Sequence, residues 1–219
     1  GPGSLIGARR VNVLVVYCHP DPGSFVHAVL ERALAGLAVG DHTVRLTDLY
    51  ADGFEPTMSP TERATHADPG VGPELQRYAD DLAWAEALVF VYPTWWGGLP
   101  AMLKGWIDRV IRPGVAYEFL EGDSGEGVPN GLLRARTAMV FNTSNTRPER
   151  EAEVFGDPLE TLWKNCVFGL CGVRDFYHRT FSVVITSSEQ QRKEWLAEVS
   201  HEVSLRFPAS QEPMPEADA

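Results

Sequence analysis

The stretch that most constrains the fold runs from Leu88 to Arg109, with the sequence LVFVYPTWWGGLPAMLKGWIDR. Its first four residues, Leu88–Val91, form an apolar run that predicts a buried strand. A loop of proline, aromatic residues and glycine follows at Tyr92–Gly98, and Pro100 suits the first turn of a helix. Open α/β sheets bind ligands at such strand-to-helix loops. Two adjacent tryptophans beside two glycines favour a flat aromatic ligand, and the alternative is a tight turn with one tryptophan in the core.

Composition excludes several classes of partner. The chain has 19 Lys and Arg against 30 Asp and Glu, a formal net charge of −11, which gives no general attraction for nucleic acid or anionic membranes. No run approaches the roughly 18–20 apolar residues of a membrane span. Cys18, Cys166 and Cys171 suit neither a disulfide framework nor a four-ligand metal site. We therefore expect a cytoplasmic protein with no metal, no nucleic-acid partner and no membrane insertion.

The length of 219 residues suits one domain with elaborated loops. The opening GPGS, residues 1–4, has the composition of an expression-tag scar. We predict a single domain over residues 5–207 and a disordered acidic tail over residues 208–219. Within the domain, Tyr50–Pro73 and Pro113–Leu133 are expected to be surface excursions, the first with one short helix after Ser59.

Apolar runs alternate with amphipathic helices along the chain. The expected strands are Arg10–Tyr17, Thr43–Leu46, Leu88–Val91, Thr137–Asn142 and Phe176–Ile185. The expected helices follow Ser24, cover Glu74–Ala85, begin at Pro100, cover Asp157–Leu170 and follow Ser187 or Ser188. This order predicts an α/β fold with a doubly wound, five-stranded parallel sheet and helices on both faces. Three loops, Cys18–Ser24, Tyr92–Gly98 and Asn142–Thr146, would then meet at one sheet edge.

The loop after the first strand, CHPDPGS, carries neither of the common nucleotide signatures, G-x-x-x-x-G-K-[ST] and G-x-G-x-x-G. Backbone N–H groups at the following helix, together with the Ser24 hydroxyl and His19, suit a phosphate; a capped helix with a surface histidine is the alternative. Cys18 does not begin a cysteine-phosphatase loop, because Ser24 stands where that loop requires arginine. We expect Cys18 to be a small buried residue.

Val13–Phe25 and Leu88–Arg109 resemble the flavodoxin-like NAD(P)H:quinone oxidoreductases. The motifs that carry the resemblance are HPDPGSF and YPTWWGGLPAMLKGWIDRV, and it continues more weakly through GDPLETLWKNCVFGLCGV to the last helix. It covers most of residues 10–205. The resemblance implies the strand order 2-1-3-4-5, a bound flavin with FAD favoured over FMN, and NAD(P)H as the electron donor.

The resemblance also implies which residues hold the flavin. The positions that hold the flavin phosphate are matched by His19, Ser24 and Phe25, and the loop against the ring is matched by Pro93, Thr94, Trp95, Trp96 and Gly97. The third flavin loop is matched by Asn142, Thr143, Ser144 and Asn145. Arg192 matches an arginine that contacts the cofactor in FAD members. Because the flavin carries the chemistry, no catalytic side chain is assigned. Asn142 and Asn145 are the candidates, since the backbone donors of Asn142–Asn145 are expected to stabilise charge on the ring.

The substrate side of the predicted site departs from the family pattern. Gly97 stands where the family has an aromatic residue, which implies a roomier site, and Phe119 replaces a tyrosine beside the matching Tyr117. The resemblance implies a homodimer in which Tyr117 and Phe119 come from the partner chain. Apolar residues at Trp106, Ile107 and Val110 suit either that contact or the core. The family's Tyr and His pair is absent after the third loop, and the candidates for its role are Arg147 and Arg150.

The function implied is a two-electron, ping-pong transfer of a hydride from NAD(P)H, through flavin N5, to a quinone, nitro-aromatic or azo acceptor. Two alternatives hold the same motifs. One is a flavodoxin-like carrier that passes single electrons to protein partners, and the other is a quinone-reductase-like regulatory subunit of a transporter. The tryptophan pair and the open Gly97–Gly98 favour a small-molecule pocket.

Overall fold

The computed structural model describes residues 9–68 and 70–209. Its centre is the predicted five-stranded parallel sheet, in the order β2-β1-β3-β6-β7 that the family resemblance implies. The strands are β1 (Asn12–Tyr17), β2 (Thr43–Asp48), β3 (Ala87–Pro93), β6 (Thr137–Thr143) and β7 (Asp175–Phe181). Every residue of β3 and β6 is buried, because helices cover both faces of these central strands. The expectations for residues 1–4 and 210–219 lie outside the described part of the chain.

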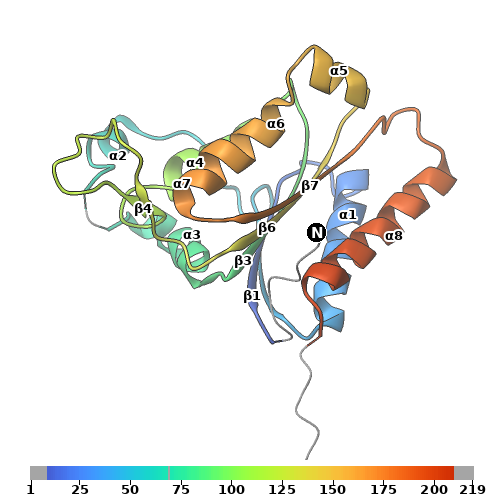
Figure 1. Cartoon of the computed structure of the whole chain (residues 1–219), viewed down its shortest axis with the longest axis horizontal. Helices are drawn as coiled ribbons and strands as arrows, with labels where there is room; N and C mark the ends of the chain where they lie inside the picture. The colour runs from blue at the N-terminus through green and yellow to red at the C-terminus, as the bar shows by residue number, and fades with distance from the viewer. Residues whose placement is uncertain (1–8, 69, 210–219) are drawn as a thin grey trace, which may run out of the picture.

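Two layers of helix sandwich the sheet (Figure 1). On one face, α1 (Phe25–Val39) lies against α8 (Glu189–Arg206), and the other face carries α3 (Pro73–Trp84), α4 (Ala101–Val110) and a continuous helical stretch. That stretch consists of α6 (Pro158–Glu160), the π-helical segment η1 (Thr161–Val167) and α7 (Phe168–Cys171). The caps agree with the predicted starts: Ser24 Oγ accepts from His27 N–H, and Ser188 Oγ from Gln191 N–H.

The core consists of one apolar layer on each face of the sheet. Cys18 is fully buried in the layer beneath α3 and α4, as expected, and Trp106 and Val110 of α4 are buried there too, so they belong to the core. In the same layer Trp163 Nε1 donates to the Tyr92 hydroxyl at 2.6 Å. Burial raises the pKa of Tyr92, so this hydroxyl stays a neutral acceptor. No helix in residues 9–68 and 70–209 has the length and apolar character to cross a membrane.

Three local elements differ from the prediction. The fifth strand ends at Phe181 rather than Ile185, at the point where its regular pairing with β6 stops at Thr143. The helix α5 (Pro148–Glu153) occupies the loop after β6 and was not expected. A small hairpin of β4 (Tyr117–Glu118) and β5 (Asn130–Gly131) interrupts the second excursion. Two-residue strands carry too little periodicity to be recognised from sequence.

The first excursion is attached to α4 by a buried ion pair. It contains the one short helix expected there, α2 (Pro60–Ala64), whose Glu62 accepts from Arg109 of α4. The shortest distance joins Arg109 Nε to Glu62 Oε2 at 2.9 Å, and only 9% and 11% of the two side chains are exposed. Arg109 also donates to the Glu55 carbonyl at 2.6 Å. The guanidinium therefore holds the whole excursion against α4.

Removing the negative charge from this pair should destabilise the protein strongly. We expect Glu62→Gln to lower the free energy of unfolding by about 3 kcal/mol, because it leaves the buried Arg109 charge without its main partner. Asp108→Asn is the matched control. It breaks the exposed pair with Lys104 on the same helix and should change the free energy by less than about 1 kcal/mol. Urea denaturation measures both, and equal losses for the two variants would contradict the assignment.

Candidate functional site

The tryptophan loop between β3 and α4 forms a two-residue turn of type I′. Trp95 N–H donates to Gly98 O and Gly98 N–H to Trp95 O, both at 3.1 Å, and Trp96 and Gly97 have φ values of +53° and +68°. Trp95 is 41% exposed and Trp96 is fully exposed. The alternative of a tight turn with one tryptophan in the core is therefore wrong.

Trp96 occupies a backbone region that bulky residues avoid. A left-handed φ costs an L-residue about 1–2 kcal/mol, and glycine or asparagine usually takes this turn position. The indole gains no burial in return, since it lies wholly in solvent. Strain of this kind concentrates at functional sites.

The loop after β6 satisfies most of its own polar groups. Ser144 N–H donates to Phe181 O at 3.0 Å, and Asn145 Oδ1 accepts from Ile185 N–H at 2.9 Å. Ser144 Oγ donates to Glu151 of α5 at 3.1 Å. Asn142 and Thr143 belong to β6, which pairs with strands on both sides. Of the expected backbone donors Asn142–Asn145, only the N–H of Asn145 has no acceptor among the described residues.

The second and third loops enclose a cavity of about 660 Å³, which we call the loop cavity. Its lining residues are Thr94, Trp96, Gly97, Ser144, Asn145, Thr146, Glu151, Phe155 and Pro158. Gly97 leaves its wall open, because a Cβ there would meet only Pro158 Cγ, at 3.7 Å. Within the described residues, the N–H groups of Trp96, Gly97 and Asn145 have no acceptor. A flat, polar-edged ring such as a flavin fits this size and this set of donors.

The first loop lies beside the tryptophan loop. The His19 ring is 6.3 Å from the Trp95 ring, and His19 Nδ1 accepts from Asp21 N–H at 2.9 Å. Phe25 packs between Phe181 and Trp195. The N–H groups of Phe25 and Val26, at the start of α1, have no acceptor among the described residues. This helix start retains the unpaired donors that a phosphate needs.

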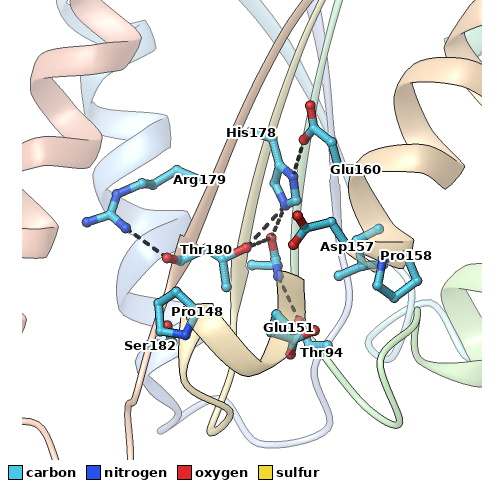
Figure 2. Close-up of a pocket in the computed structure, with 12 residues that line it drawn as sticks. Thr94, Pro148, Glu151, Asp157, Pro158, Glu160, His178, Arg179, Thr180 and Ser182 are labelled. Carbon is cyan, nitrogen blue, oxygen red and sulfur yellow. Dashed lines mark hydrogen bonds and ion pairs between the residues drawn. The ribbon is translucent and has the colours of Figure 1, made fainter. Parts of the chain in front are cut away.

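A second cavity of about 320 Å³, which we call the side cavity, adjoins the loop cavity and contains residues that the sequence analysis missed (Figure 2). The two cavities share Thr94, Glu151 and Pro158. The missed polar residues that line the side cavity are Glu151, Asp157, Glu160, His178, Arg179, Thr180 and Ser182. The alternation of side chains along β7 could have found two of them. His178 and Thr180 lie on the same face of the strand as Phe176, and the residues between them face the core layer on the other side of the sheet.

His178 is the centre of a hydrogen-bonded cluster in the side cavity. Figure 2 shows its ring between Glu160 and Thr180. Its Nδ1 lies 2.9 Å from Glu160 Oε2, and its Nε2 lies 2.5 Å from Asn142 Oδ1 and 3.3 Å from Thr180 Oγ1. Asn142 Nδ2 donates to Thr94 Oγ1 at 2.7 Å. A single network thus joins α6, β7 and β6 to the tryptophan loop.

Several predicted site residues line neither cavity. Arg192 donates twice to Ser187 at the start of α8. Tyr117 and Phe119 pack edge to face on the small hairpin, with ring centroids 5.7 Å apart. Arg147 and Arg150 are exposed on and before α5. These residues are absent from the linings of both cavities.

The fold and the cavities define a class: a doubly wound α/β protein with a cofactor-sized cavity at the carboxyl edge of its sheet. The chain belongs to the family with a flavodoxin-like fold, whose model matches residues 11–203. It is 31% identical over 186 residues to an uncharacterised NAD(P)H oxidoreductase of Haemophilus influenzae, covering 84% of this chain and 89% of that protein.

Two further likenesses extend over most of the chain. Human ribosyldihydronicotinamide dehydrogenase [quinone] is 28% identical, with 93% of this chain and 94% of that protein covered. The structure of an NAD(P)H:quinone oxidoreductase from Methanothermobacter marburgensis has a TM-score of 0.76 at 25% identity, covering 90% of this chain and 96% of that one. The predicted resemblance to this class of enzymes is confirmed.

Relieving the strain at Trp96 should stabilise the fold. We expect Trp96→Asn to raise the free energy of unfolding by about 1 kcal/mol, because Asn-Gly is a preferred type I′ pair. Val39→Asn, at an exposed apolar residue with no positive φ, is the control and should not raise it. Chemical denaturation measures both; a Trp96→Asn protein less stable than the parent would show that the indole makes a stabilising contact.

The three cysteines should differ sharply in reactivity. Burial raises the pKa of Cys18 and of Cys171 to about 12, whereas Cys166 is exposed. At mildly alkaline pH, where both buried thiols stay protonated, a disulfide reagent should titrate one thiol per folded chain and three after unfolding. Cys166→Ser should abolish the reaction of the folded protein. Rapid modification of Cys18 in the folded chain would contradict its burial.

Proposed function

We propose that the loop cavity binds a flavin and that the protein uses it to pass a hydride from NAD(P)H to a quinone or a similar small electrophile. One observation carries the proposal: two loops from neighbouring strands enclose a 660 Å³ cavity lined by Trp96 and by unpaired backbone donors. The bound flavin would supply the redox chemistry, alternately accepting and donating two electrons.

The residues of this chain have three tasks in the proposed reaction. The turn at Trp96 and Gly97 would bring the backbone against the ring, and Trp96 itself would cover part of it. The N–H groups of Trp96, Gly97 and Asn145 would donate to the ring, and donors fixed in advance stabilise developing charge without reorganisation. His19, Ser24 and the start of α1 would hold the phosphate.

The acceptor site is proposed to be completed by a second copy of the chain. Tyr117 and Phe119 line neither cavity within their own chain, and the family resemblance supports a role for them from a partner in a homodimer. Gly97 leaves room beside the ring for quinones, nitro-aromatics or azo compounds in turn with NAD(P)H. The proposed preference for FAD over FMN rests on the resemblance of the first loop and on Arg192, whose guanidinium donates to Ser187 in this structure.

The visible spectrum of the purified protein tests the proposal. We expect the spectrum of oxidised flavin, directly or after addition of FAD or FMN, and its bleaching by NAD(P)H followed by recovery with a quinone. Trp96→Asn should weaken flavin binding about tenfold, as expected for loss of a stacked ring, and Val39→Asn should leave it unchanged. Mass spectrometry of the released flavin distinguishes FAD from FMN.

Each alternative function predicts a different result in the same experiment. A single-electron carrier would bind flavin but would not oxidise NAD(P)H steadily with a quinone. A regulatory subunit would co-purify with a membrane transporter. A colourless protein that binds neither FMN nor FAD would overturn the proposal altogether.

A further inference from the structure

A row of hydrogen bonds leads through the side cavity to Thr94, at the wall that the side cavity shares with the loop cavity. It runs from Glu160 on α6 through His178 on β7 and Asn142 on β6 to the hydroxyl of Thr94. The contact distances along it are 2.9, 2.5 and 2.7 Å. We call it the Glu160–Thr94 relay. Only 13% of the His178 side chain and 1% of Asn142 are exposed, so water has little access to its middle.

The chemistry of the amide fixes the direction of these bonds. Asn142 Oδ1 can only accept, so His178 Nε2 must carry the proton that it donates. Thr180 Oγ1 donates to the same oxygen at 3.0 Å, so both lone pairs of the carbonyl are used. The other ring nitrogen, Nδ1, lies 2.9 Å from Glu160 Oε2, which is a hydrogen-bond distance. In this orientation of the amide Nδ2 is directed at Thr94, whereas a rotated amide would place Nδ2 against His178 and would require an unprotonated Nε2.

The relay ends at the hydroxyl of Thr94, which already accepts one hydrogen bond. Thr94 Oγ1 accepts from Asn142 Nδ2, so its own proton must point elsewhere. Among residues 9–68 and 70–209, no acceptor for that proton is present, and Thr94 lines both the loop cavity and the side cavity. The relay therefore leaves the Thr94 proton free to donate to a ligand in the cavity.

We propose that His178 is a positioning residue that acts through Asn142 to hold the Thr94 hydroxyl as a donor to the flavin. Glu160 supports it by fixing the orientation of the imidazole. The inference rests on the proposed function, because that function supplies the ligand of the loop cavity. It gives the cavity a side-chain donor beside its backbone N–H groups.

A set of matched variants isolates the relay. In His178→Gln the amide nitrogen lies near the position of Nε2 and can still donate to Asn142, whereas His178→Asn reaches only the position of Nδ1. Thr94→Val removes the hydroxyl, and Thr94→Ser keeps it. His201→Asn, at an exposed histidine on α8, controls for loss of an imidazole. Glu160→Gln is a milder second probe at a half-exposed position, for use where His178→Asn does not fold.

The flavin dissociation constant and the midpoint potential of the bound flavin are measured for each variant. We expect His178→Asn and Thr94→Val each to weaken binding about tenfold, which corresponds to one lost hydrogen bond, and to shift the potential in the same direction. His178→Gln, Thr94→Ser and His201→Asn should change binding less than about twofold. The double variant His178→Asn/Thr94→Val should match Thr94→Val alone, since the histidine acts through the threonine.

Additive losses in the double variant would overturn the proposal, because His178 would then act independently of Thr94. Nitrogen NMR of the apo-protein gives a readout without flavin: we expect a proton on His178 Nε2, and an unprotonated Nε2 overturns the relay. If the parent protein bound no flavin, the proposed function would fail. The relay would then be decided by this NMR signature and by whether His178→Asn shifts the Thr94 methyl signal in the apo-protein.

Discussion

The register of three neighbouring parallel strands is the constraint on which the site depends. Tyr92 of β3, Asn142 of β6 and Thr180 of β7 lie level with one another in the sheet. Because side chains alternate between faces, all three point toward the α6–α7 layer. A shift of one residue would turn Asn142 to the other face and separate it from His178 and Thr94. The buried ladders thus specify the polar network as firmly as they specify the core.

Polarity rises along these strands toward their carboxyl ends. On the face beneath α6 and α7, the successive side chains are Leu88, Phe90 and Tyr92 in β3, Ala138, Val140 and Asn142 in β6, and Phe176, His178 and Thr180 in β7. The apolar members fix the strands in a dry core, and the polar members come where the sheet meets the cavities. Each polar group there finds a partner, as buried polar groups require. The same ladder therefore positions both the core and the site.

The sequence predicts what local periodicity and turn chemistry determine. The five strands, their order through the resemblance, and the tryptophan loop follow from patterns within about twenty residues. The role of His178 could not be predicted in this way, because Asn142 lies 36 residues earlier and Glu160 lies on another element. The predicted end of β7 was wrong for a related reason. Regular pairing of β7 stops where β6 ends, and that point cannot be read from the sequence of β7 alone.

The third loop and the tryptophan turn contribute unequally to the free backbone donors at the loop cavity. Its side chains at Ser144 and Asn145 hold the loop itself together, and Ser144 N–H is bound to Phe181, so this loop presents a single free backbone donor. Two more donors come from Trp96 and Gly97, and a type I′ turn leaves the N–H groups of its two central residues unpaired. The left-handed conformation of Trp96 belongs to the same turn that places both unpaired donors beside an exposed indole, so backbone strain and free donors coincide at the loop cavity.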